Sequence, residues 1–171
     1  DFFIAGSAEE VKPVAEYVES SVALVKHIPV LAVAKGNPKN IQGIADLGRA
    51  GIQTVTGDPK STPVGKIAQK AFSDFGVKDS VHLAASTTTA PQLATIIGLK
   101  EADAAIVWKE NCASDGVEIC NTKDMDAYIK TVPAAKLKFT KFPEAAAGFS
   151  IFLASDTAKN IWISSGYELA Q

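Results

Sequence analysis

Residues 52–75 read IQTVTGDPKSTPVGKIAQKAFSDF, and this stretch decides the fold class. A strand is predicted at Ile52–Thr56. A helix is predicted at Pro63–Phe75, because apolar residues recur there at every third or fourth position, and Gly76 follows as a stop signal. The stretch is therefore one strand–loop–helix unit, with the loop at the carboxyl end of the strand.

The same alternation extends outward in both directions. Further strands are predicted at Phe2–Ala5, Ile28–Ala34, Val81–Ala85, Ala104–Trp108 and Val117–Cys120. Further helices are predicted at Ala8–Ser20, Ile41–Leu47 and Gln92–Leu99. Strands that alternate with helices are typical of βαβ units with a parallel sheet, so the predicted fold class is α/β.

The pattern changes after residue 126. An extended run at Tyr128–Leu137 is followed by two helices back to back, which begin at Pro143 and at Ser155. A helical pair with no strand between its members does not continue the βαβ pattern. We therefore expect the chain to leave one lobe here and to pack on another.

Composition limits the classes of function. The chain has 171 residues, of which 47% are hydrophobic and 21% charged, as expected for a globular protein with a real core. The net charge is -2 and no basic run occurs, which argues against a nucleic-acid surface. No apolar stretch reaches the roughly 18 residues that a membrane span needs. Cys112 and Cys120 lack a metal-ligand spacing, and they are either a disulfide or two free thiols.

The loop at Gly57–Lys66 favours an anion. Thr62 or Ser61 can cap the following helix, and Pro63 suits its first position. Three backbone N–H groups are then predicted to be free, those of Val64, Gly65 and Lys66. The helix dipole adds about half a positive charge there, and Gly65 would let a ligand approach closely. An ordinary capped turn is the alternative.

A nucleotide-binding P-loop does not fit the loop. That motif places Gly-Lys-Ser/Thr after four residues, whereas seven residues separate Gly57 from Gly65, and Ile67 follows Lys66. Ile67 has no hydroxyl for Mg²⁺. We also find no recognisable catalytic motif, and the chain is not expected to be an enzyme.

Two more strand ends carry polar or aromatic residues. Thr89, within Ser86–Pro91, is predicted at a helix start after one strand, with its N–H and hydroxyl on offer, and Trp108 ends another strand. In open parallel sheets, ligands bind outside the carboxyl ends of strands. The three segments therefore predict one site, although a Thr-rich cap and a packing aromatic are the plain alternatives.

The loop also carries a family resemblance. Residues 57–66, GDPKSTPVGK, followed by a helix with Ala68 and Ala71, resemble the GDP-x-x-x-PAG-x-YA-x-x-AL segment of periplasmic molybdate-binding proteins. Residues 1–7 are similar to that family's ADVFISA strand, and residues 28–38 to its hinge strand followed by KGNP. Residues 143–167 are similar to its C-terminal segment, so the resemblance covers nearly the whole chain.

The resemblance implies a type II periplasmic-binding-protein fold with two α/β lobes joined by a hinge. Residues 28–132 would form lobe 2, and residues 1–27 and 133–171 would be parts of lobe 1. The family begins with a further strand and helices that carry two oxyanion-binding serines. The first lobe is therefore expected to be incomplete in this chain.

The resemblance also implies a function. Val64 and Thr89 match residues whose backbone N–H binds the oxyanion, Trp108 falls where the family usually has a tyrosine, and Thr62 and Gly65 belong to the same binding loop. The implied protein captures molybdate or tungstate and delivers it to the membrane subunits of an ABC importer. It would be a periplasmic or otherwise extracytoplasmic monomer, with or without a lipid anchor, and would need no cofactor and no direct cation ligands.

Three alternatives stay open. The departure at Trp108 favours another oxyanion such as sulfate or phosphate. The effector-sensing domain of a transcription regulator shares this architecture. An enzyme, of a nucleotide-dependent kind, is the third alternative, and the P-loop spacing argues against it.

Overall fold

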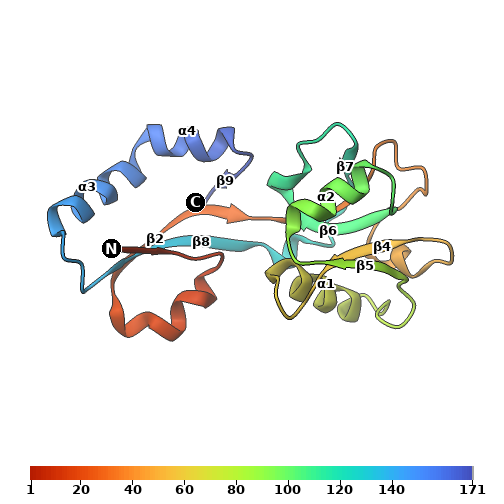
Figure 1. The fold of residues 1–171 in the computed structure, drawn as a ribbon, viewed down its shortest axis with the longest axis horizontal. Coiled ribbons are helices and arrows are strands. Elements are labelled where there is room, and N and C mark those ends of the chain that lie inside the picture. The colour runs from red at the N-terminus through yellow and green to blue at the C-terminus, as the bar shows by residue number, and fades with distance from the viewer. Residues whose placement is uncertain (171) are drawn as a thin grey trace. The chain divides into compact units, whose positions relative to one another are not determined.

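The computed structural model describes residues 1–170, which form two compact units (Figure 1). Unit 1 consists of Asp1–His27 and Ile129–Gln171, and unit 2 is the continuous segment Ile28–Tyr128. The chain therefore passes twice between the units. No helix among residues 1–170 is long and apolar enough to cross a membrane.

Unit 2 is built on a five-stranded sheet with the order β5-β4-β6-β3-β7. Its strands are β3 Pro29–Ala34, β4 Thr54–Gly57, β5 Leu83–Thr87, β6 Ala104–Trp108 and β7 Val117–Ile119. Its helices are α1 Pro63–Asp74 and α2 Ala90–Gly98, with short 3-10 turns at η2 Ile44–Gly48, η3 Lys109–Cys112 and η4 Asp126–Tyr128. The α/β class that the sequence predicted is confirmed.

The sheet of unit 2 is mixed, which corrects the expectation of a parallel sheet. Strands β5, β4 and β6 are parallel, because α1 and α2 carry the chain back across the sheet between them. The connection from β4 to β5 and the connection from β5 to β6 run in opposite directions across the sheet, so right-handed crossovers place α1 and α2 on opposite faces (Figure 1). Strand β3 is not linked to β6 or β7 by such a crossover, and it pairs antiparallel with both.

The core of unit 2 forms around strand β6. Ala104, Ala105, Ile106 and Val107 are fully buried, because β6 lies between β4 and β3 and both faces of the sheet are covered. Leu93 and Ile97 of α2 and Ala68 and Ala71 of α1 belong to the same buried cluster. A near-continuous apolar run in the sequence thus became the central strand.

Unit 1 contains a four-stranded antiparallel sheet with the order β1-β8-β2-β9. Its strands are β1 Phe2–Ile4, β2 Val18–His27, β8 Lys130–Leu137 and β9 Glu168–Leu169. Two helices follow β8, namely α3 Pro143–Ala154 and α4 Asp156–Ser164, as the sequence predicted. In Figure 1 these helices lie above β2 and β8, and the 3-10 segment η1 Ala8–Tyr17 lies below them.

The predicted α-helix at Ala8–Ser20 is wrong. The segment forms the 3-10 helix η1 and then enters strand β2 at Val18. Pro13 lies inside η1, where it has no N–H to donate and its ring opposes α-helical bonding. No residue of η1 is fully buried, so the predicted apolar face does not form part of a core.

The pairing of strand β2 with β8 places one boundary between the units at a different residue from the predicted one. Strand β2 pairs with β8 over most of its length, up to His27 opposite Lys130. Residues 129–132, predicted to close lobe 2, therefore lie in unit 1, because a strand is held by its partner along the sheet. The second boundary falls between Tyr128 and Ile129 instead of after Val132.

Candidate functional site

Three strand ends meet at one edge of the sheet in unit 2. Strands β5, β4 and β6 are neighbours and run parallel, so their carboxyl ends share an edge. Gly57 and Thr87, the last residues of β4 and β5, lie opposite each other in the register. Helices α1 and α2 begin just beyond them. The structure thus brings together the three segments that the sequence selected, whose candidate residues are Thr62, Val64, Gly65, Thr89 and Trp108.

Asp58 organises the loop between β4 and α1. Its side-chain oxygens accept the N–H of Lys60 at 2.9 Å and the hydroxyl of Ser61 at 3.1 Å. Its carbonyl accepts the N–H of Ser61 at 3.1 Å and that of Thr62 at 2.8 Å. The carboxylate, which would repel an anion, is thus bonded to groups of its own loop. Sequence reasoning noted Asp58 only as a weak acid–base candidate.

Thr62, one of the two predicted cap residues, caps α1. Its hydroxyl oxygen accepts the N–H of Gly65 at 3.1 Å and donates to the carbonyl of Asp58 at 2.8 Å. The N–H of Lys66 donates to the carbonyl of Thr62 at 3.2 Å. The expectation that Val64, Gly65 and Lys66 all keep free N–H groups is therefore wrong for the last two. A cap and the first helical bond take up these donors.

Val64 keeps the remaining donor of that first turn. Within residues 1–170 no hydrogen-bond acceptor is found for its N–H, while its side chain is buried with 1% of its surface exposed. A buried N–H without a partner is uncommon and costs free energy comparable to a lost hydrogen bond. This N–H, at the positive end of the α1 dipole, is thus suited to an anionic acceptor.

Gly65 packs closely against the protein's own backbone, and the predicted close approach of a ligand at Gly65 stays a prediction. A Cβ built at Gly65 would lie 2.6 Å from the carbonyl carbon of Gly57 and 2.7 Å from the hydroxyl oxygen of Thr62. At Gly57, a Cβ would lie 3.1 Å from the nitrogen of Gly65. The two glycines let the start of α1 pack directly on the end of β4, so Gly65 makes room for the protein's own backbone.

Thr89 is the N-cap residue of α2, with an extended backbone and an exposed side chain. Its hydroxyl makes no capping bond, and no acceptor for its N–H is found among residues 1–170. Pro91 in the first turn has no N–H of its own. The start of α2 therefore offers further free donors at the same edge as Val64.

Thr87 connects the two loops, and sequence reasoning did not select it. Its carbonyl accepts the N–H of Asp58 at 2.8 Å, and its hydroxyl donates to the carbonyl of Thr89 at 2.9 Å. The signal was present as four consecutive hydroxyl residues at Ser86–Thr89. Which of them faces the neighbouring strand follows from the register of β5 on β4, which the sequence does not contain.

Trp108 lies at the predicted strand end, but its side chain is buried, with 6% of its surface exposed. It belongs to the main apolar cluster of unit 2 and stands opposite Pro29 in the pairing of β6 with β3. Packing in this apolar cluster therefore covers most of the surface of the ring. A direct contact between the indole and a ligand stays a prediction.

The cysteines are two free thiols, Cys112 half-buried and Cys120 buried. Burial raises the pKa of Cys112 to about 11, and it also raises the pKa of Cys120. Both thiols are thus protonated at neutral pH, and the Cys120 thiol donates to the carbonyl of Ile41 at 3.2 Å. Residues 1–170 contain no cluster of His, Cys, Asp or Glu that could hold a metal ion.

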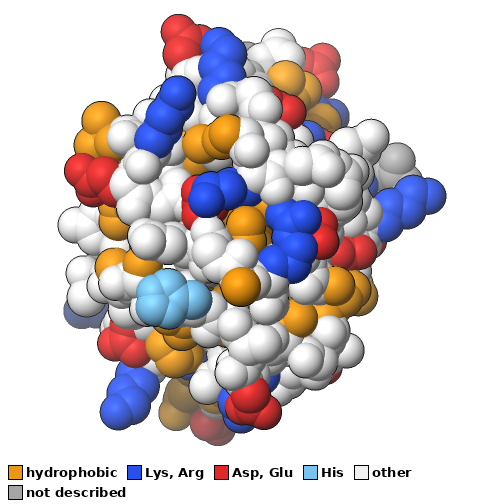
Figure 2. Space-filling model, turned by 90° about the vertical axis from the view of Figure 1, so that its right-hand side faces the viewer, with side chains coloured by type: hydrophobic (Ala, Val, Ile, Leu, Met, Phe, Trp, Pro, Cys, Tyr) orange, Lys and Arg blue, Asp and Glu red, His pale blue; other side chains and the backbone are white. Residues whose placement is uncertain are grey.

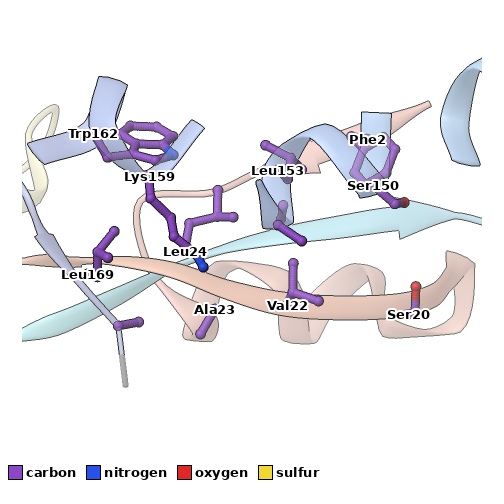
Figure 3. A pocket seen from close by; sticks show the side chains of 13 residues that line it. Phe2, Ser20, Val22, Ala23, Leu24, Ser150, Leu153, Lys159, Trp162 and Leu169 are labelled. Atoms are coloured by element: carbon purple, nitrogen blue, oxygen red, sulfur yellow. The ribbon is translucent and has the colours of Figure 1, made fainter. Parts of the chain in front are cut away.

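A separate cavity of about 320 Å³ lies within unit 1 (Figure 3). Its wall is mainly apolar: Leu153 from α3 and Trp162 from α4 lie over Leu24 of β2 (Figure 3). Lys159 reaches into the same space. A dianion needs several converging donors, so this apolar cavity is a poorer oxyanion site than the strand ends of unit 2.

The surface carries no strong single-sign field on the face drawn in Figure 2, where lysines and arginines are interspersed with acidic and uncharged side chains. The net charge of the whole chain is -2. A site for a dianion on this face would therefore rely on local donors, such as helix N-termini, and not on a basic patch.

Comparisons with known proteins concern the family of the chain and its fold. A family described as bacterial extracellular solute-binding protein matches residues 1–168. A binding protein of Haemophilus influenzae is 25% identical over 173 residues, which is 98% of this chain and 70% of that protein.

Two solved structures show the same fold. The substrate-binding domain assigned to a molybdenum ABC transporter of Clostridium difficile matches with a TM-score of 0.76 and 22% identity, over 100% of this chain and 77% of that one. The sulfate-binding protein SubI of Mycobacterium tuberculosis matches with a TM-score of 0.75 and 18% identity, over 98% of this chain and 68% of that one.

Proposed function

Because the chain belongs to the bacterial extracellular solute-binding proteins, which bind solutes and are not enzymes, we propose that it captures a tetrahedral oxyanion, molybdate or tungstate, for an ABC importer. Its fold is the type II periplasmic-binding-protein fold that the resemblance implied. The proposal places the protein outside the cytoplasm, where it would deliver the oxyanion to the membrane subunits of the importer.

One observation carries the choice of an oxyanion. The N–H groups of Val64 and Thr89 have no acceptor within residues 1–170, and they lie at the starts of two helices beside neighbouring strand ends. Each helix start carries about half a positive charge. Neutral donors of this kind stabilise a fully deprotonated dianion without a countercharge. They offer no acceptor to a protonated ligand such as hydrogen phosphate.

Sulfate is the second candidate, and Trp108 favours it. By the resemblance, the residue stands where the molybdate-binding family usually has a tyrosine, so the tyrosine hydroxyl is replaced here by a buried indole ring. The structural similarity to a sulfate-binding protein agrees with this alternative. Sulfate is smaller than molybdate, so the two proposals differ in the size of the ligand that fits.

Thermal unfolding of the protein with each oxyanion in turn tests the proposal. Molybdate, tungstate, sulfate and phosphate are added separately, with Mg-ATP as a control for a nucleotide site. A ligand at 100 times its Kd adds about 2.7 kcal/mol to the free energy of unfolding. Stabilisation by molybdate or tungstate alone supports the proposal. Stabilisation by sulfate alone would mean that sulfate is the ligand. If no oxyanion raises the melting temperature, the proposal is wrong.

A pair of substitutions at Thr89 locates the site. Thr89→Asp keeps a strong N-cap residue but adds a negative charge beside the proposed ligand, and Thr89→Asn has nearly the same shape without the charge. Repulsion of a dianion at about 5 Å costs on the order of 2 kcal/mol even in water. The aspartate variant should therefore bind at least tenfold more weakly than the asparagine variant in calorimetric titrations. Equal affinities of the two variants would exclude a site at the start of α2.

A further inference from the structure

Thr87 makes two bonds that connect the donor loops. Its carbonyl accepts the N–H of Asp58, the first residue after β4, at 2.8 Å. Its hydroxyl donates to the carbonyl of Thr89, the cap residue of α2, at 2.9 Å. One residue at the end of β5 thus joins the loop before α1 to the first residue of α2.

The second bond fixes a peptide plane. The carbonyl of Thr89 and the N–H of Ala90 belong to the same peptide, and residues 1–170 contain no cis peptide bond. In a trans peptide the N–H points opposite to the carbonyl. Because the hydroxyl of Thr87 holds the carbonyl, it directs the N–H of Ala90 away from β5. No acceptor for the Ala90 N–H is found among the described residues.

We infer that Thr87 is a positioning residue for the oxyanion site, and that its hydroxyl orients the Thr89–Ala90 peptide so that the N–H of Ala90 becomes a further donor to the ligand. This inference rests on the proposed function. Thr87 itself does not touch the ligand. It acts by holding the start of α2 at a fixed orientation to the loop of Asp58, and thereby sets the spacing between the donors of the two helices.

The bond is suited to orient a peptide without supporting the fold. Thr87 is only half-buried and Thr89 is exposed, and β5 is one of the two edge strands of the sheet. Replacing Thr87 by valine keeps the shape and the preference for a strand, so the folded state should survive. Loss of the hydrogen bond from the Thr87 hydroxyl should then mainly change the orientation of the Thr89–Ala90 peptide. That loss matters when an anion must be met by several donors at once, because preorganised donors need no reordering on binding.

Three variants test the inference. Thr87→Val removes the hydroxyl, and Thr87→Ser keeps it while removing the methyl group. Thr95→Val is the matched control, because the Thr95 hydroxyl also donates to a backbone carbonyl, that of Pro91 at 3.2 Å, one turn further along α2. Affinity for the oxyanion that the wild type binds most tightly is measured by calorimetric titration at 25 °C, and the ¹⁵N and ¹H shifts of the Ala90 amide are recorded without ligand.

We expect Thr87→Val to weaken binding about three- to tenfold, the worth of one hydrogen bond. Thr87→Ser and Thr95→Val should stay within about twofold of the wild type. The Ala90 amide should shift in Thr87→Val and return toward its original position in Thr87→Ser. A merely structural role for Thr87 would lower the melting temperature without this pattern.

The outcomes separate the two proposals. If the wild type binds an oxyanion and Thr87→Val binds it equally well, the positioning role is wrong while the proposed function stands. The positioning role is also wrong if Thr87→Ser is as weak as Thr87→Val, since the hydroxyl would then not be the cause. If the wild type binds no oxyanion of the panel, the proposed function is wrong and the role of Thr87 falls with it.

Discussion

The two units bury their apolar residues to very different extents. In unit 2 one cluster extends through both faces of the sheet and includes residues of β3, β4, β6, α1 and α2. In unit 1 the buried cluster is small, with Leu24, Val25, Val132, Ala134 and Leu153 as its members. Phe142 and Ile151 of unit 1 meanwhile expose 69% and 73% of their surfaces.

Helix α3 shows the reason for this difference. Its sequence, PEAAAGFSIFLA, is apolar on all sides, a composition typical of a helix that is buried all round. Only Ala146 and Leu153 are buried in α3, while six residues of the amphipathic α1 are. Unit 2 therefore buries the apolar face of α1 in its own core, whereas unit 1 leaves most of the apolar surface of α3 exposed.

The largest expected effect is the difference between Ile106 and Ile151. Ile106, in the central strand β6, has 0% of its surface exposed, so Ile106→Ala should lower the free energy of unfolding by about 2–5 kcal/mol. Ile151→Ala, on exposed α3, should change it by less than about 0.5 kcal/mol. Urea unfolding followed by circular dichroism measures both. A comparable loss for Ile151→Ala would mean that the α3 face is covered in solution.

Glycine substitutions give a second, smaller contrast. At Gly65 of α1 an added Cβ meets the backbone of Gly57, so Gly65→Ala should cost about 1–3 kcal/mol of stability and weaken oxyanion binding. At Gly148, inside α3, nothing lies within 4 Å of an added Cβ. Gly148→Ala should therefore stabilise the protein by about 0.5–1 kcal/mol, because alanine favours the helix.

Thermal unfolding of both glycine variants, with and without the bound oxyanion, measures this contrast. Ligand affinity in Gly148→Ala serves as the reference, since Gly148 lies in unit 1. If Gly65→Ala were as stable as the wild type, α1 would not need to pack directly on β4. The account of the Gly57–Lys66 segment as a close-packed loop would then be wrong.

The same contrast explains what could be predicted from the sequence. Strand β6 was predicted at its observed bounds, and α1 to within one residue, because each carries a full apolar pattern that one unit buries. Strand β2 was missed: its residues Val18–Ser21 are half-buried or exposed, and they form a strand only because β8, more than a hundred residues later, pairs with them. Apolar periodicity in a sequence indicates which residues are buried. A strand that pairs without burying many of its side chains therefore carries little apolar periodicity.

The candidate site divides in a similar way. That three segments converge follows from strand ends in a parallel sheet, and the sequence was sufficient for it. That Thr62 takes up the N–H of Gly65, and that Thr87 bonds both Asp58 and Thr89, depends on hydrogen-bond geometry after folding. Several hydroxyls in each loop were equivalent candidates for these bonds. Only the register of β5 on β4 and the course of the loop distinguish them.

The smallest expected effect is a difference in pH dependence between the units. In unit 2 burial, together with the Asp74 carboxylate 2.6 Å away, raises the pKa of Tyr128 from 10.0 to about 12. In unit 1 the hydrogen bond from Lys130, at 3.0 Å, holds the pKa of Glu9 below its usual 4.5. Tyr128 thus gives unit 2 an alkaline response that Glu9 does not give unit 1. Asp74, whose pKa is lowered by its hydrogen bonds with Lys70 and Tyr128, adds an acid response to unit 2 as well.

The direction of each response follows from proton linkage. Between about pH 10 and pH 12 unfolded Tyr128 loses its proton while folded Tyr128 keeps it, so the free energy of unfolding falls as pH rises through this window. For Glu9 stability is present above its usual pKa and is lost as pH falls through the lowered one. Tyr128→Phe should therefore flatten the alkaline fall, by about 1 kcal/mol or less because its partner Asp74 is exposed. Glu9→Gln should leave that fall unchanged and reduce only the acid one.

Urea unfolding of both variants and of the wild type, from pH 3 to about pH 12, measures these effects. Each variant is compared with the wild type at the same pH, so that the titration of the thiols and lysines common to all three proteins cancels. If Tyr128→Phe and the wild type lost stability in parallel above pH 10, the bond between Tyr128 and Asp74 would not hold the end of unit 2 to α1.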